Sequence, residues 1–133
     1  MTKRVIYLAG PYRAETEAEI EANIERARDV AKLLWRAGFV VICPHANTAH
    51  FERDCPYVDF VTGDLEIVAR CHYVVMLDGW EKSKGACRER AFAKASGIEV
   101  FDSLDEFKAN IDAPGASRIE GEGGCNSRSL TEG

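Results

Sequence analysis

Three carboxylates are candidates for catalytic residues: Asp64, Asp78 and Glu89. Asp64 directly follows Gly63, Asp78 ends an apolar run, and Glu89 lies six residues after Ser83. Two carboxylates from separate elements in one cleft suit glycosidic chemistry. One attacks the anomeric carbon or stabilises an oxocarbenium-like transition state, and the other handles a proton. The alternative for each acid is an ordinary solvated side chain, which is the usual state of Asp and Glu.

Two short segments have the composition of an anion-binding site. Ser83-Lys84-Gly85-Ala86 opens a helical pattern, where free backbone N–H groups, the helix dipole and the Ser83 hydroxyl favour an anion. Gly10 permits close backbone approach, and Arg13 offers a guanidinium group. The alternatives are a plain N-cap serine in the first segment, and a turn glycine with a surface arginine in the second. Dinucleotide and Walker phosphate patterns do not occur, and we expect no cofactor.

Alternating apolar runs and helical patterns predict the elements that position these residues. The apolar runs cover residues 4–9, 39–43, 73–77 and 98–101, and the helical patterns cover residues 16–37, 57–71, 83–96 and 103–111. Strands this apolar are typical of a sheet that is buried on both faces. We therefore predict an α/β fold: an open parallel sheet of four to five strands with helices on both faces, a flavodoxin/Rossmann-like three-layer sandwich. Ligands of such sheets bind beyond the carboxyl ends of the strands, here residues 10–13, 44–47 and 78–85.

Local signals refine this outline. Thr16 with Glu19 forms a possible capping box, and Gly38 is placed to end the first helix. Residues 45–56 are predicted to form a long loop that contains His45 and His50. With Cys55 these histidines would still need further ligands, so we expect no metal. The five cysteines include no C-x-x-C pair, which argues against a disulfide framework, and Cys43, Cys71 and Cys87 are expected to be small buried hydrophobes.

The composition excludes several classes of protein. The 133 residues carry 17 Lys and Arg against 22 Asp and Glu, a net charge of −5, which argues against binding to a nucleic acid polymer. No apolar run approaches the length of a membrane span, and the N-terminus lacks the apolar core of a signal peptide, so we expect a cytoplasmic protein without a membrane partner. From residue 112 the sequence becomes rich in Gly and Ser. We predict one domain over 1–111 and a flexible tail over 112–133.

Three motifs together resemble the nucleoside 2-deoxyribosyltransferase-like superfamily. They are Tyr7-Leu8-Ala9-Gly10-Pro11, Gly63-Asp64-Leu65 ahead of a Val-Val strand, and Ser83-x-Gly85-x-x-x-Glu89. The resemblance covers about residues 4–101 and is greatest to the 2′-deoxynucleoside 5′-phosphate N-hydrolase branch and to small phage and bacterial members. It identifies residues 1–111 as a domain of this type.

The resemblance implies roles for the candidate residues. Glu89 corresponds to a nucleophile that forms a glycosyl–enzyme intermediate at C1′, and Asp64 to an aspartate that transfers a proton or orients the sugar. Ser83 and Gly85 correspond to donors for a 5′-phosphate. Gly10 and Arg13 correspond to the loop that lines the nucleotide pocket, and Asp78 lies near the place of a base-contacting acid.

The expected function is therefore cleavage of the base–sugar bond of a nucleoside or deoxynucleoside 5′-monophosphate. Ser83 favours this hydrolase, because the transferases act on nucleosides without a phosphate. Two alternatives stay open: a nucleoside deoxyribosyltransferase that moves the sugar to a second base, and a non-catalytic module that binds or senses nucleotides. The resemblance also implies a homodimer or higher homo-oligomer in which a neighbouring subunit closes the site.

Overall fold

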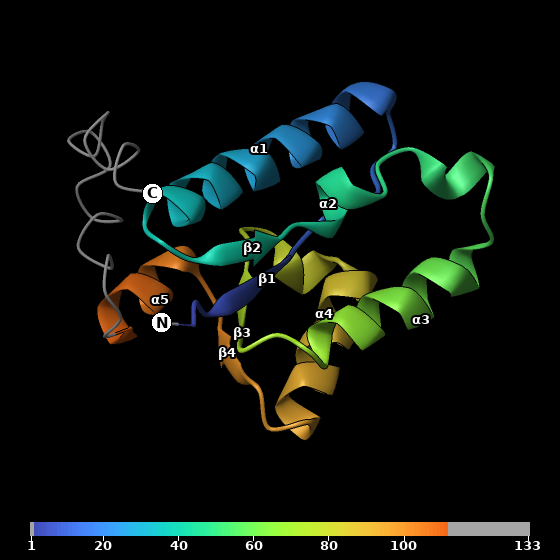
Figure 1. Ribbon diagram of the computed structural model, residues 1–133. Helices are drawn as coiled ribbons and strands as arrows, with labels where there is room; N and C mark the ends of the chain where they lie inside the picture. Colours follow the sequence, from blue (N-terminus) through green and yellow to red (C-terminus); the bar gives the residue numbers. More distant parts are fainter. Residues whose placement is uncertain (1, 112–133) are drawn as a thin grey trace.

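A computed structural model describes residues 2–111, except for the side chains of residues 46, 47 and 53. Its centre is a parallel sheet in the order β2-β1-β3-β4 (Figure 1). The strands are β1 (Val5–Ala9), β2 (Val40–Ile42), β3 (Tyr73–Met76) and β4 (Glu99–Phe101). The chain adds β2 on one side of β1 and then places β3 on the other side. The carboxyl ends of β1 and β3 therefore form the switch point where ligands of such sheets bind.

Pairing within the sheet is parallel throughout, as predicted. Ile6 to Ala9 of β1 pair with Tyr73 to Met76 of β3, and Val5 to Tyr7 pair with Val40 to Ile42 of β2. The two central strands are almost wholly buried. The expectation that all strands are buried is wrong for β4, where Glu99 is exposed and Val100 is half-buried. The reason is position, since β4 is an edge strand that pairs with β3 alone.

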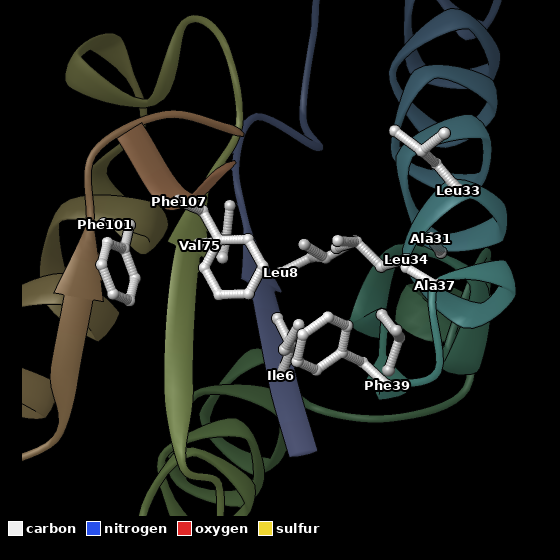
Figure 2. Packing of buried hydrophobic residues seen from close by; sticks show 11 residues of the cluster. Ile6, Leu8, Ala31, Leu33, Leu34, Ala37, Phe39, Val75, Phe101 and Phe107 are labelled. Atoms are coloured by element: carbon white, nitrogen blue, oxygen red, sulfur yellow. The ribbon is translucent and has the colours of Figure 1, made fainter. Parts of the chain in front are cut away.

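Helices cover both faces, which confirms the three-layer α/β prediction. The helices α1 (Glu17–Arg36) and α5 (Leu104–Asn110) lie on one face, and α3 (Tyr57–Val68) and α4 (Lys84–Ala95) lie on the other. On the first face, Leu34 of α1 and Phe107 of α5 pack onto Ile6 and Leu8 of β1 (Figure 2). On the second face, Tyr7, Ala9, Val74 and Met76 meet small residues of α4, namely Ala86 and Ala93. The small side chains allow close approach of α4 to the sheet.

The predicted helix ends are found close to their expected places. The hydroxyl of Thr16 accepts a hydrogen bond from the Glu19 N–H at 3.1 Å, which caps α1. Gly38 adopts φ +102° just after that helix, and Gly97 adopts φ +80° after α4, a conformation that side chains disfavour. The second long helix, α3, ends at Val68 rather than at residue 71, because residues 69–71 turn back by hydrogen bonds to Leu65, Ile67 and Val68.

The segment expected to be a loop over 45–56 contains helical turns. These are the short helix α2 (Pro44–Asn47) and a 3₁₀ turn, η1 (Phe51–Arg53). Pro44 occupies the first turn of α2, where its missing N–H is not needed, so the proline that follows β2 also starts a helix. A second 3₁₀ turn, η2 (Trp80–Lys82), lies between β3 and α4.

Other expectations have mixed outcomes. Cys71 is buried, whereas Cys43 and Cys87 are only half-buried. The predicted tail over 112–133 lies outside the described residues. Within residues 2–111, no helix combines the length and the apolar character that crossing a bilayer requires.

Candidate functional site

A cavity of about 660 Å³ opens at the carboxyl end of the sheet. Its wall is built by the segments that follow β1, β2 and β3, together with α3 and the first turns of α4. All the site residues predicted from the sequence line it: Gly10, Arg13, Asp64, Asp78, Ser83, Gly85 and Glu89. These residues are up to 79 positions apart in the chain, and the parallel topology gathers them at one edge.

Glu89 is held in the cavity wall by a hydrogen bond from the neighbouring strand. The Tyr7 hydroxyl donates to its Oε2 at 2.9 Å. Burial raises the pKa of Glu89 to about 7; the Tyr7 hydrogen bond and the charge of Arg88 oppose this rise, and the charge of Asp64 adds to it. The carboxyl group therefore keeps its proton to a higher pH than an ordinary glutamate does. It is not an ordinary solvated helix glutamate.

Asp64 is the second carboxylate of the cavity, and it is half-buried. Burial raises its pKa to about 6. It comes from α3, whereas Glu89 comes from α4, and these two helices pack side by side. Two acids from separate elements thus line one cavity, and the charge of Asp64 adds to the rise in the pKa of Glu89. The third candidate, Asp78, also lines the cavity but is exposed.

The N-terminus of α4 faces the same cavity. The Ser83 Oγ accepts a hydrogen bond from the Ala86 N–H at 3.1 Å, so Ser83 is an N-cap. Its hydroxyl proton is left to donate to a ligand. A Cβ added at Gly85 would meet nothing within 4 Å, which leaves open space above this backbone. The N-cap interpretation and the anion-site interpretation are therefore compatible.

Basic side chains surround this end of the cavity. Arg13 stacks on the ring of Tyr57 at 4.9 Å, and Arg88 donates to the Tyr57 hydroxyl at 3.4 Å. Lys82 and Lys84 flank Ser83 and also line the cavity. Arg13 and Arg88 come from different elements and meet at one aromatic ring, so they present two guanidinium groups at the cavity mouth.

Gly10 lines the cavity as expected, and the structure also shows a packing constraint at this position. An added Cβ would lie 2.6 Å from the Leu77 Cβ, closer than real side chains approach. The glycine is therefore required where the ends of β1 and β3 pass each other. Its contribution to close ligand approach stays a prediction.

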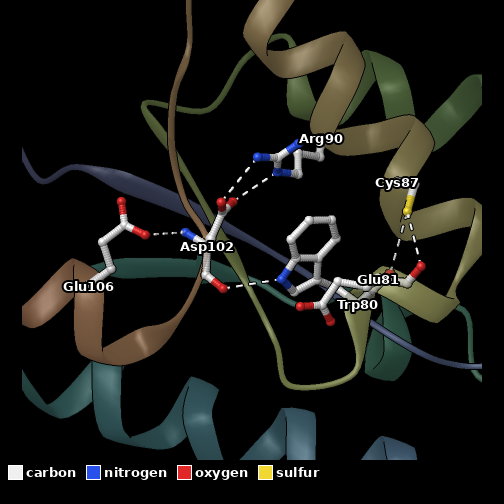
Figure 3. Close-up of polar contacts among 6 residues, drawn as sticks. All are labelled: Trp80, Glu81, Cys87, Arg90, Asp102 and Glu106. Carbon is white, nitrogen blue, oxygen red and sulfur yellow. Dashed lines mark hydrogen bonds and ion pairs between the residues drawn. The ribbon is translucent and has the colours of Figure 1, made fainter.

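A cluster outside the cavity fixes the loop that leads to Ser83 (Figure 3). Both oxygens of the Asp102 carboxylate accept from Arg90, at 2.8 and 3.0 Å. The Arg90 guanidinium also lies 4.7 Å from the centre of the Trp80 ring, and the Trp80 indole N–H donates to the Asp102 carbonyl at 3.2 Å. Trp80 belongs to η2, the turn that precedes α4, and Asp102 directly follows β4. These contacts therefore hold η2 against the end of β4.

Sequence reasoning misses several residues of the cavity wall. It treats Tyr7 only as part of a strand and of a motif. A tyrosine in an otherwise apolar strand nevertheless indicates that its hydroxyl group has a hydrogen-bond partner inside the fold. It considers His45 only as a metal ligand. Among the described residues, the group whose ligand atoms lie close together is instead Glu17, Glu21 and His50, which is exposed.

A comparison with protein families gives one match. The model of a family described as a domain of unknown function, DUF4406, matches residues 4–102. The match includes every candidate residue of the cavity. No curated protein matches the chain.

Proposed function

The chain belongs to the DUF4406 family, and we propose that this member is an N-glycosidase acting on a nucleoside or deoxynucleoside 5′-monophosphate. One observation carries the proposal: two desolvated carboxylates, Asp64 and Glu89, share a cavity with the N-terminus of α4. A pair of carboxyl groups can attack the anomeric carbon and transfer the proton in glycosidic cleavage. The free backbone N–H groups at a helix N-terminus can bind a phosphate. The resemblance to the nucleoside 2-deoxyribosyltransferase-like superfamily supports the same assignment.

In this mechanism Glu89 is the nucleophile. Its ionised carboxylate attacks C1′, the C1′–N bond breaks, and the bonding electron pair leaves with the base nitrogen, which takes up a proton. Water then attacks the glycosyl ester, gives up a proton, and releases the sugar phosphate with regeneration of Glu89. The Tyr7 hydroxyl orients the carboxylate through the bond to Oε2. Asp64 transfers the proton or orients the sugar.

The phosphate end of the ligand is assigned to α4. Backbone N–H groups at the start of this helix, the Ser83 hydroxyl and the Arg13 guanidinium supply the donors. Arg88, Lys82 and Lys84 add positive charge on the same side. This assembly lies beside the two acids, as a 5′-monophosphate with C1′ at Glu89 requires.

The oligomer implied by the resemblance is part of this proposal. Tyr57 and Val58 at the start of α3 are 50% and 59% exposed, and Tyr57 lines the cavity. A neighbouring subunit that covers these side chains would close the site. Sedimentation at several protein concentrations gives the oligomeric state, and a monomer at all of them would remove this part of the proposal.

Release of free base from a panel of nucleotides tests the activity. The panel contains deoxy- and ribonucleoside 5′-monophosphates and the matching nucleosides. Glu89→Gln should lower base release by several orders of magnitude and leave binding largely intact, because covalent catalysis is lost while shape is kept. Glu99→Gln, on the exposed edge strand, is the matched control and should be unaffected.

Other outcomes distinguish the alternatives. Equal use of nucleosides and monophosphates, with transfer of the sugar to an added second base, would identify a deoxyribosyltransferase. Binding without any base release, unchanged in Glu89→Gln, would identify a nucleotide-sensing module. Near-normal activity of Glu89→Gln would remove the nucleophile assignment.

A further inference from the structure

Tyr57 is a residue of the cavity wall to which the proposed mechanism assigns no step. It is the first residue of α3, it is 50% exposed, and it lines the cavity. Two cations from other elements contact it: Arg13, in the segment after β1, and Arg88, in α4. Both arginines also line the cavity. One aromatic side chain therefore joins three elements at the cavity mouth.

The two contacts use different parts of the Tyr57 side chain. The Arg13 guanidinium carbon lies over the ring, 4.9 Å from its centre, which is a cation–π distance. The Arg88 Nη1 group donates to the hydroxyl at 3.4 Å, at the long end of the hydrogen-bond range. The face of the ring and its hydroxyl group can therefore hold both guanidinium groups at the same time.

Neither guanidinium group forms an ion pair among residues 2–111. The ion pairs of this part of the chain involve other basic residues, namely His50, Arg70, Arg90 and Lys108. Arg13 and Arg88 therefore keep their positive charge and their N–H donors for an anionic ligand. An aromatic partner suits this task, because it holds a guanidinium group without neutralising it.

Holding these side chains in place affects the affinity for such a ligand. An arginine side chain that is free in solvent loses rotamer freedom when it binds a ligand, which weakens binding about two- to tenfold for each side chain. The contacts with Tyr57 restrict Arg13 and Arg88 before any ligand arrives, so this loss is smaller. A common partner also sets the spacing between two groups that come from separate elements.

We propose that Tyr57 is a positioning residue for the phosphate group of the ligand: its ring holds Arg13 and its hydroxyl holds Arg88. The inference rests on the proposed function, which supplies the 5′-phosphate at this end of the cavity. Tyr57 acts through the two arginines and not on the phosphate itself. Its removal should therefore weaken binding of a nucleoside 5′-monophosphate and leave binding of the matching nucleoside unchanged.

The phosphate preference, defined as the Kd of the nucleoside divided by the Kd of its 5′-monophosphate, measures this effect. Both constants are determined by calorimetry in the Glu89→Gln background, which prevents turnover. The ligand is the tightest-binding of AMP, GMP, CMP, UMP and their 2′-deoxy counterparts. Tyr57→Leu removes both contacts and should lower the preference about tenfold. Tyr57→Phe keeps the ring, removes the hydroxyl and should lower it only about two- to threefold.

The same substitutions in proteins that lack the arginines locate the effect. With Arg13→Gln and Arg88→Gln both present, Tyr57→Leu should leave the preference unchanged, because nothing remains for Tyr57 to position. With Arg88→Gln alone, Tyr57→Phe should have no effect. A fall in preference that is as large without the arginines as with them would mean that Tyr57 contacts the phosphate directly, and would overturn the proposal.

Phe51→Leu is the matched control, because Phe51 is 47% exposed and does not line the cavity. It should leave the preference unchanged. The nucleoside serves as an internal control, since a folding defect or a lost contact with a neighbouring subunit would weaken binding of nucleoside and monophosphate alike. Equal weakening of both ligands in Tyr57→Leu, or an unchanged preference in that variant, would overturn the proposal.

The outcomes also distinguish this proposal from the proposed function. Base release with a phosphate preference that Tyr57→Leu does not lower would overturn the role of Tyr57 alone. A preference that depends on Tyr57, in a protein that releases no base, would overturn the glycosidase and leave the role of Tyr57 in place. Failure of every monophosphate to bind would overturn both.

Discussion

The carboxyl group of Glu89 lies where burial opposes its charge. Desolvation raises its pKa to about 7, and the Tyr7 hydrogen bond limits the rise. A nucleophile must be ionised, so the same environment that keeps water away also reduces the active fraction below neutral pH. Tyr7 therefore links a position in the middle of the sheet to the pKa of a helix residue.

We predict that kcat/KM for base release falls as the pH falls through about 7, because Glu89 becomes protonated. Tyr7→Phe should shift this limb to higher pH, since the donor that favours the ionised carboxylate is lost. Asp64→Asn should shift it to lower pH, since a neighbouring negative charge is lost. A pH–rate profile of the three proteins measures both shifts.

The opposite shifts serve as the control, because ionisation of the substrate phosphate occurs at the same pH for all three proteins. A limb that falls toward high pH instead would identify Glu89 as a general acid. A limb of the pH–rate profile that neither substitution moves would report ionisation of the substrate phosphate instead of Glu89.

We also predict that Glu89→Gln stabilises the protein at pH 8 but not at pH 4. The pKa of Glu89 is raised from 4.5 to about 7, so the unfolded chain loses this proton first and stability falls as the pH rises between these values. The neutral amide avoids that loss. Thermal unfolding at pH 8 should show a gain of about 1–3 kcal/mol. If Glu89→Gln changed the free energy of unfolding equally at both pH values, the claim that burial destabilises the ionised Glu89 carboxylate would be wrong.

At the scale of elements, the start of α4 carries the Ser83 N-cap and the phosphate site that we propose. We predict that Ser83→Ala lowers the free energy of unfolding by about 1 kcal/mol through loss of the N-cap. It should also weaken monophosphate binding about tenfold, because a hydrogen bond to a charged group is lost. Unfolding curves and dissociation constants for a monophosphate and its nucleoside measure the two effects separately.

Ser103→Ala provides a matched control for this prediction. Ser103 caps α5 in the same way, accepting from the Glu106 N–H at 3.0 Å, and it does not line the cavity. Its loss should reduce stability to a similar extent without changing affinity. Equal preference for monophosphate and nucleoside in the parent protein would remove the phosphate site from α4.

At the scale of the whole molecule, the described residues already form a complete sandwich. The sheet, both helical layers and the cavity are built from residues 2–111. We predict that truncation after Ile111 leaves the Tm within about 4 °C, a change below roughly 1 kcal/mol for a domain of this size. A larger fall in thermal unfolding would mean that residues beyond Ile111 contribute to the fold.

The sequence by itself determined the elements and the edge of the sheet that carries the site. Apolar runs such as 73–77 predict buried strands, and Thr16, Gly38 and Ser83 mark helix ends, because these signals act over a few residues. Parallel strands then bring their carboxyl ends together, so spacing is enough to place Gly10, Asp78 and Ser83 at one edge. Asp64 and Glu89 lie within helices, and they join this edge only through the packing of α3 and α4. The helical turns within 45–56 are not predicted, because short turns leave no periodic pattern.

Only the tertiary structure decided what each side chain touches. Tyr7 and Glu89 are 82 positions apart, and their hydrogen bond depends on how α4 packs across β1. Gly10 is required because Leu77 passes within contact distance, and His45 is buried with its Nε2 atom 2.7 Å from the Pro11 carbonyl oxygen, 34 positions away in the chain. Periodicity fixes the face on which a residue lies, whereas burial, and with it each shifted pKa, depends on all the elements that pack around that face.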